Sequence, residues 1–163
     1  MQRDDLRLLS ELPLFRELTT TELMMVLMAT SKKHYEPGQV IVREGNEGDS
    51  LFIVKEGEVE VRKYDGKGIE HQLATLGPGE CFGEISLIDF EPRSASVYAQ
   101  TDCTLYQITR NNFADLILHH KEIERKFYKA ISITLAQRLR RVNESLTFNL
   151  EIGEMITEIE KKG

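Results

Sequence analysis

The sequence predicts a mainly β fold with flanking helices, in which a double-sheet jelly-roll β-barrel lies between N-terminal helices and a long C-terminal helix. Glycine is concentrated in the middle of the chain, where nine of the eleven glycines fall between Gly38 and Gly83. The same region holds seven or eight short strand-like segments with a turn every eight to twelve residues, as antiparallel barrels do. Apolar residues at helical spacing occupy both flanks.

The length of 163 residues fits one domain with a core of adequate size. We expect this domain to have three parts. An N-terminal helical segment is predicted over residues 1–34, the barrel over 35–109 and the C-terminal helices over 110–163.

Two helices are expected before the barrel. The first covers Asp4–Glu11, because leucines recur there on one face, at Leu6, Leu8, Leu9 and Leu12. The second begins with a capping box, in which Thr19 caps the first turn and Glu22 reaches back to the cap. It is expected to end before Pro37, whose ring cannot continue a helix.

The barrel strands are predicted from short runs of β-branched and aromatic residues between turns. Glu58–Arg62 alternates strictly, so Val59 and Val61 should face the core while the charged residues face water. The other predicted strands are Val40–Val42, Leu51–Val54, Leu73–Leu76, Ala95–Ala99 and Thr104–Ile108. The connection at Asp65–Gly68 reads as a hairpin tip.

The segment of residues 80–97, which we call the cassette, carries the residues from which we predict a function. Gly83 has no Cβ, so the backbone there can approach a ligand closely. Glu84–Leu87 is expected to form one helical turn whose first N–H groups suit an anion. Arg93 can bond two oxygens of a phosphate, whereas the negative charge of Glu84 suits a sugar hydroxyl. A phosphate and a ribose in one compact pocket describe a small nucleotide.

The cassette resembles the phosphate-binding cassette of cyclic nucleotide-binding domains, in both Phe82–Leu87 and Pro92–Val97. The similarity covers roughly residues 12–146 and extends to the sensor domains of catabolite activator-type regulators and to protein kinase A regulatory subunits. It implies that Glu84 accepts a hydrogen bond from the ribose 2′-hydroxyl and that Arg93 pairs with the cyclic phosphate. It also implies a set of phosphate contacts from the N–H groups of Gly83, Ile85, Ser86 and Ala95 and from the Ser94 hydroxyl.

Two helices are expected after the barrel, the first from Thr109 to about His120 and the second from Glu122 toward Asn149. The second carries a seven-residue apolar repeat at Leu135, Leu139, Val142 and Leu146. This repeat fits either packing on the chain's own barrel or a dimer seam, and the resemblance favours a homodimer. The final residues, 151–162, are expected to add one or two amphipathic turns.

Asn143 lies where related proteins reach from this helix to the base. Its amide has a donor and an acceptor and so can pair with the edge of a purine. The other interpretation is an exposed polar position on a helix. Because no other residue discriminates between the bases, we expect modest selectivity between cAMP and cGMP, with cAMP slightly preferred.

Composition excludes several classes of function. The net charge of −6 and the pI of about 5.3 argue against a nucleic-acid surface. No apolar run approaches the ~20 residues of a membrane span, and the acidic N-terminus is unlike a signal peptide, so a cytoplasmic location is expected. The two cysteines, Cys81 and Cys103, are expected to be buried free thiols. The four histidines are scattered and form no set of metal ligands, so we expect neither a metal site nor a cofactor.

The sequence therefore predicts a stand-alone regulatory domain that binds cAMP or cGMP and repositions its C-terminal helix for a partner protein that the sequence does not identify. It predicts no enzymatic activity. One alternative is an interaction module of the same fold that has lost its ligand affinity. The other is a small cupin-type barrel enzyme, which would need paired histidines on strands, and the sequence contains no His-x-His.

Overall fold

Two antiparallel sheets of four strands each form the centre of the structure and confirm the predicted jelly roll. The computed structural model describes residues 2–160, except for the side chains of residues 2, 138, 141, 142 and 145–160. The first sheet has the order β1 (Ser31–Tyr35), β8 (Cys103–Thr109), β3 (Ser50–Glu56), β6 (Cys81–Phe82). The second has the order β2 (Val40–Val42), β7 (Ser96–Ala99), β4 (Val59–Tyr64), β5 (Glu70–Leu76).

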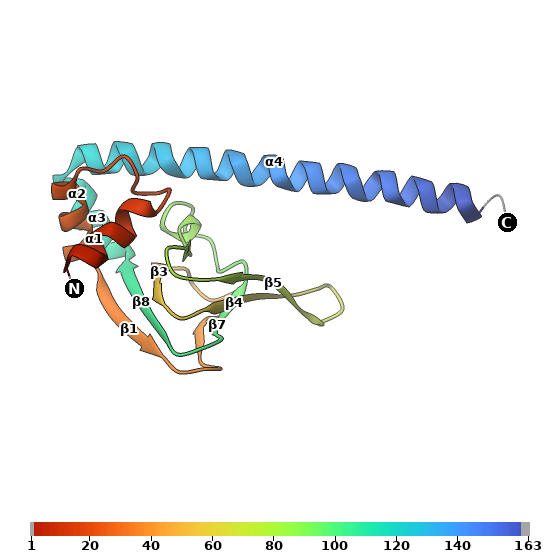
Figure 1. Ribbon diagram of the computed structural model, residues 1–163, viewed down its shortest axis with the longest axis horizontal. Helices are drawn as coiled ribbons and strands as arrows, with labels where there is room; N and C mark the ends of the chain where they lie inside the picture. Colours follow the sequence, from red (N-terminus) through yellow and green to blue (C-terminus); the bar gives the residue numbers. More distant parts are fainter. Residues whose placement is uncertain (1, 161–163) are drawn as a thin grey trace.

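The helices gather at one end of the barrel, where the last of them begins (Figure 1). They are α1 (Gln2–Glu11), α2 (Thr20–Met28), α3 (Arg110–His119) and α4 (Lys121–Glu160). No helix in the described part of the chain has the length and apolar character needed to cross a membrane.

The capping box predicted at the start of α2 is confirmed. The Thr19 hydroxyl accepts from the Glu22 N–H at 3.3 Å, and the Glu22 carboxylate accepts from the Thr19 N–H at 2.7 Å. The helix ends at Met28, however, and β1 begins at Ser31, inside the segment that we expected to be helical. The sequence of β1 is almost entirely polar and exposed, so no alternation indicates a strand there.

Strand β3 separates the two parts of the core. Leu51 and Ile53 belong to the cluster beneath the helices, whereas Phe52 and Val54 belong to the cluster between the sheets. Because both faces of β3 are covered, its sequence is a continuous apolar run instead of an alternating one.

The first turns of α4 are fastened to the other helices. Phe127 is fully buried, with its ring centroid 4.5 Å from that of Phe113 and 6.2 Å from that of Phe15. Nearby, Lys126 contacts the Glu22 carboxylate at 2.7 Å. This apolar and ionic contact places the start of α4 against α2 and α3.

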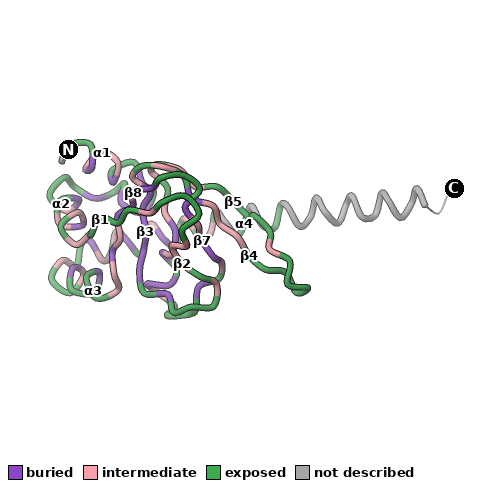
Figure 2. Tube along the Cα trace, turned by 90° about the horizontal axis from the view of Figure 1, so that it is seen from below, coloured by how far each residue is buried: buried purple, intermediate pink, exposed green. Residues whose placement is uncertain are grey.

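Two element boundaries differ from the prediction. The helix α4 continues through Gly153 to Glu160. A glycine inside a helix costs about 1 kcal/mol of helix stability, which the many good helix formers of α4 offset. It therefore includes most of residues 151–162, whose side chains lie outside the described residues. Strand β5 begins at Glu70, three residues before the predicted start at Leu73. The prediction missed these residues because this edge strand is mostly exposed and its first residues are polar (Figure 2).

The alternation of β4 is only partly as predicted. Val59 is fully buried, but Val61 is half-buried because it lines a cavity. Glu60 and Arg62 form an ion pair with each other on the opposite face, which leaves both half-buried. The two cysteines are free thiols, of which Cys103 is buried and Cys81 is half-buried.

Candidate functional site

Arg93 is a buried cation at the centre of the cassette. Its Nη2 donates to the Ser50 carbonyl at 2.7 Å, and its Nη1 lies 3.5 Å from the Ser86 hydroxyl. Burial lowers the pKa of Arg93, the exposed Asp49 carboxylate at 3.7 Å offsets part of that effect, and Arg110 nearby adds to it. A positive charge in this setting favours an anion as its partner.

Gly83 allows a close approach of the backbone to Arg93, whereas the sequence suggested one to a ligand. Its φ is +80°, in the region that side chains rarely adopt. A Cβ at this position would overlap the Arg93 guanidinium and lie 2.7 Å from the Ser50 carbonyl oxygen. The glycine therefore lets the backbone pass directly over Arg93.

The turn predicted after Gly83 is present. Glu84 has helical backbone angles and precedes the short 3-10 helix η1 (Ile85–Leu87), in which the Leu87 N–H donates to the Glu84 carbonyl at 3.3 Å. Glu84 and Ser86 are only 4% and 7% exposed. The cassette thus contains both a buried carboxylate, Glu84, and a buried cation, Arg93.

The second half of the cassette is tied to the loop after β2. The Arg93 N–H donates to the Asn46 carbonyl at 2.8 Å, and the Arg93 carbonyl accepts from the Gly45 N–H at 2.9 Å. The Ser96 hydroxyl accepts from the Glu44 N–H at 2.9 Å. These bonds hold the second half of the cassette against this loop.

Seven of the predicted site residues line one cavity of about 470 Å³, which we call the main cavity. Residues of β2, β4 and β5 form its opposite wall, and Val42, Val61 and Ala74 make that wall apolar. The seven residues are Gly83, Glu84, Ile85, Ser86, Arg93, Ser94 and Ala95. The cavity thus combines a charged floor with an apolar wall.

Asn143 is the exception. It is exposed on α4 and is not among the described residues that line the main cavity. The prediction that it joins the other seven depends on how closely α4 approaches the barrel, which the local sequence does not determine.

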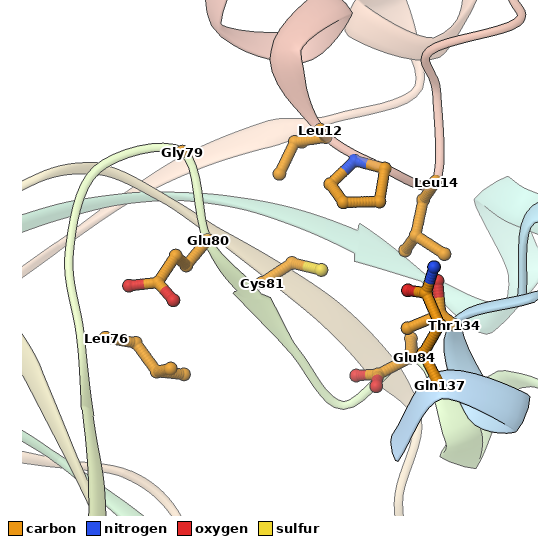
Figure 3. Close-up of a pocket in the computed structure, with 10 residues that line it drawn as sticks. Leu12, Leu14, Leu76, Gly79, Glu80, Cys81, Glu84, Thr134 and Gln137 are labelled. Atoms are coloured by element: carbon orange, nitrogen blue, oxygen red, sulfur yellow. The ribbon is translucent and has the colours of Figure 1, made fainter. Parts of the chain in front are cut away.

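Two residues that the sequence analysis did not single out, Thr134 and Gln137, approach the site instead. They line a second cavity of about 270 Å³, which adjoins the main one and shares Leu76, Cys81 and Glu84 with it. Figure 3 shows the Glu84 carboxylate beside Gln137. Their spacing of three residues puts them on one face of α4, but a helical face alone gives no sign of what it meets.

The connection between α1 and α2 also lines the second cavity, through Leu12, Pro13 and Leu14. Figure 3 shows Leu14 beside Thr134 of α4, with the β5–β6 turn at Gly79 and Glu80 on another side of the cavity. This cavity is therefore bounded by three parts of the chain that are far apart in sequence.

The structure thus combines a jelly roll with a buried arginine and a buried carboxylate in one segment. Residues 32–120, more than half of the chain, match the family model of the cyclic nucleotide-binding domain. The chain belongs to this family.

The proteins that are similar in sequence include a nucleotide receptor and an enzyme. The chain is 34% identical over 134 residues to the Cyclic AMP receptor protein of Thermus thermophilus, a match that covers 82% of this chain and 60% of that protein. It is 33% identical to Glutaminase 2 of Bradyrhizobium diazoefficiens, over 83% of the chain and 21% of that protein.

Among solved structures, the regulatory domain of Toxoplasma gondii PKA, crystallised with cAMP, is 32% identical and superposes with a TM-score of 0.67. The match covers 71% of this chain and 44% of that one. The chain thus spans less than two thirds of the length of each of these three proteins.

Proposed function

We propose that the chain binds cAMP or cGMP in the main cavity, with Arg93 on the cyclic phosphate and Glu84 on the ribose 2′-hydroxyl. The observation that carries this proposal is that Arg93 and Glu84 are both buried and both line the same cavity. A cyclic nucleotide, which carries an anionic phosphate and one free ribose hydroxyl, satisfies a cation and a carboxylate together. The family to which the chain belongs supports the assignment.

The rest of the cassette would complete the phosphate contacts. The N–H groups of Gly83, Ile85, Ser86 and Ala95 and the Ser94 hydroxyl are the proposed donors, as in the resemblance from which we predicted them. Their position on the wall of the main cavity supports this role. Backbone donors suit a phosphate because they are held in place before the ligand arrives.

The base would occupy the second cavity, beside α4. The Thr134 hydroxyl donates to the Ala130 carbonyl at 3.0 Å, so its oxygen remains available to accept from an amino group of the base. The Gln137 amide can donate and accept, and therefore fits either purine. A contact with Asn143 would require α4 to move toward the barrel.

The proposed role is regulatory and not catalytic. Binding would order the cassette and shift the position of α4, and a partner protein would detect that change. Leu135 and Leu139 are 37% and 61% exposed, which supports a homodimer through α4 over packing of these residues on the barrel. The predicted Val142 and Leu146 of this seam lie outside the residues whose side chains are described. Free thiols at Cys81 and Cys103 are in keeping with the cytoplasm as the proposed location.

Isothermal titration calorimetry with cAMP, cGMP and 5′-AMP tests the proposal. We expect both cyclic nucleotides to bind in the micromolar range, within about tenfold of each other, and 5′-AMP to bind more weakly. As a matched control, Arg43→Ala removes an exposed arginine outside the main cavity and should leave both affinities unchanged. Absence of binding by cAMP and cGMP at millimolar concentration would contradict the proposal and favour an interaction module without a ligand.

A further inference from the structure

Lys63, near the end of β4, holds a backbone carbonyl of the cassette and is not among the described residues that line the main cavity. Its Nζ donates to the Ser94 carbonyl at 2.6 Å, which is a short, charge-assisted hydrogen bond. The Glu44 carboxylate lies 3.4 Å from the same ammonium group and also accepts from the Tyr64 N–H at 3.2 Å. The Glu44 carboxylate thus holds the ammonium group of Lys63, which donates to the Ser94 carbonyl.

The position of Lys63 follows from strand geometry. Side chains two residues apart on a strand share a face, so Lys63 lies on the same face as Val61, which lines the main cavity. Strand β4 pairs with β7 through Val61↔Val97 and Arg62↔Ser96. The next position along β4 therefore falls beside the last residues of the cassette before β7.

The hydrogen bond has a consequence for the neighbouring N–H. The Ser94 carbonyl and the Ala95 N–H belong to one peptide unit, and the structure has no cis peptide bond among the residues that it describes. In a trans peptide the C=O and N–H point in opposite directions. A lysine that holds the Ser94 carbonyl therefore also fixes the direction of the Ala95 N–H, and Ala95 lines the main cavity.

We propose that Lys63 is a positioning residue of the ligand site, which orients the Ser94–Ala95 peptide so that its N–H is ready to donate to the anionic group of the ligand. This inference rests on the proposed function, in which that group is the cyclic phosphate. Lys63 acts through the peptide, and it differs in this from Arg93, which lines the main cavity itself.

A set of matched variants tests the role. Lys63→Met removes the charge and the donor but keeps the length of the side chain, whereas Lys63→Arg keeps both charge and donors. The control is Lys67→Met, which makes the same change of net charge at the exposed tip of the same hairpin. Calorimetry with cAMP should show affinity about 5- to 20-fold weaker for Lys63→Met, near wild type for Lys67→Met, and largely restored for Lys63→Arg.

Salt separates positioning from long-range attraction. At 1 M salt the Debye length falls to about 3 Å, so a purely electrostatic contribution of Lys63 would disappear. We expect the loss of affinity in Lys63→Met to persist at that salt concentration. Equal affinities of wild type and Lys63→Met, or a difference that vanishes in high salt, would overturn the proposal.

A ligand-free measurement keeps this inference separate from the proposed function. Amide NMR of the unliganded protein should show shifts at Ala95 in Lys63→Met that Lys67→Met does not produce. If the wild type binds neither nucleotide, the proposed function fails, but the Ala95 shifts still decide whether Lys63 orients the peptide. An unchanged Ala95 amide would refute that orientation. Lys63→Gln replaces the methionine variant if the latter does not fold.

Discussion

Arg93 keeps its charge in a place where burial disfavours it. Its side chain is 5% exposed, and burial is the main reason that its pKa lies below the ordinary value. The guanidinium also lies over the Phe52 ring, 5.9 Å from the ring centroid. An anionic ligand would meet a cation that has already lost most of its water, which strengthens the attraction between them.

Replacing Arg93 should therefore abolish useful affinity. Arg93→Ala is expected to cost roughly 2–5 kcal/mol of binding free energy, which moves a micromolar site to the millimolar range or beyond. Arg93→Lys should also lose much of the affinity, since an ammonium group cannot bond two oxygens in the same geometry. Calorimetry with cAMP measures both changes, and affinity like that of the wild type in Arg93→Ala would place the phosphate elsewhere.

Gly83 offers a test that leaves all charges in place. Gly83→Ala forces a side chain into a left-handed backbone conformation and against Arg93 and Ser50. We expect a loss of about 1–3 kcal/mol in the free energy of unfolding, together with weaker nucleotide binding. Gly66→Ala is the control, because a Cβ there meets no atom within 4 Å. Equal melting temperatures of the two variants would contradict the close contact at Gly83.

The elements show where sequence patterns are informative and where they are not. Strands β3, β4 and β8 have at least one buried face, and their apolar residues predicted them. Strands β1 and β5 are edge strands that are mostly exposed, so β1 was not predicted and β5 was predicted only over Leu73–Leu76. The capping box of α2 was predictable because cap and partner lie three residues apart.

The helix α1 is attached to the barrel by a buried charge. Asp5 is 5% exposed and lies 3.5 Å from the ammonium groups of Lys32 on β1 and Lys55 on β3. Burial alone would raise the pKa of Asp5, but the Tyr106 hydroxyl and the two lysines outweigh burial. The pKa of Asp5 consequently lies below its ordinary value of 3.8.

This attachment predicts a pH dependence of stability. A carboxyl whose pKa is lower in the folded state stabilises the fold above its unfolded pKa, and this contribution is lost as the pH falls through the folded value. Asp5→Asn should lower the free energy of unfolding by about 1–3 kcal/mol at pH 7, and the difference from the wild type should shrink below about pH 4.

Thermal unfolding between pH 2.5 and 7 measures the effect of Asp5→Asn. Asp115→Asn, at an exposed carboxylate on α3, provides the comparison and should match the wild type throughout. A difference between Asp5→Asn and the wild type that stays constant across this range would show that packing, and not ionisation, is what Asp5 contributes.

At the scale of the whole molecule, the site could be predicted only as far as it is local. The cassette places Gly83, Glu84 and Arg93 within ten positions of one another, so a short motif was enough to bring them together. Thr134 and Gln137 reach the second cavity because α4 docks on the barrel, which depends on packing between distant segments. A helical position such as Asn143 gives no information about that docking.

Assembly is the property of the whole molecule that a single substitution can test. If Leu135 and Leu139 belong to a dimer seam, Leu139→Glu places like charges across the interface and should give monomers in sedimentation velocity. Leu118→Glu is the matched control, because Leu118 on α3 is 63% exposed, close to the 61% of Leu139. A wild type that is monomeric at high micromolar concentration would exclude the seam.

One carboxylate both completes the first turn of α2 and anchors α4. Glu22 accepts from the Thr19 N–H and from Lys126, each at 2.7 Å, so the start of α4 is held by a carboxylate that the first turn of α2 keeps in place. Beyond this anchor, Ile131 is the last buried residue of α4 among the side chains that are described. Under the proposed function, in which ligand binding repositions α4, its pivot would lie after Ile131. The helix would then act as a lever that is clamped at its base and free to turn next to the second cavity, which Thr134 lines.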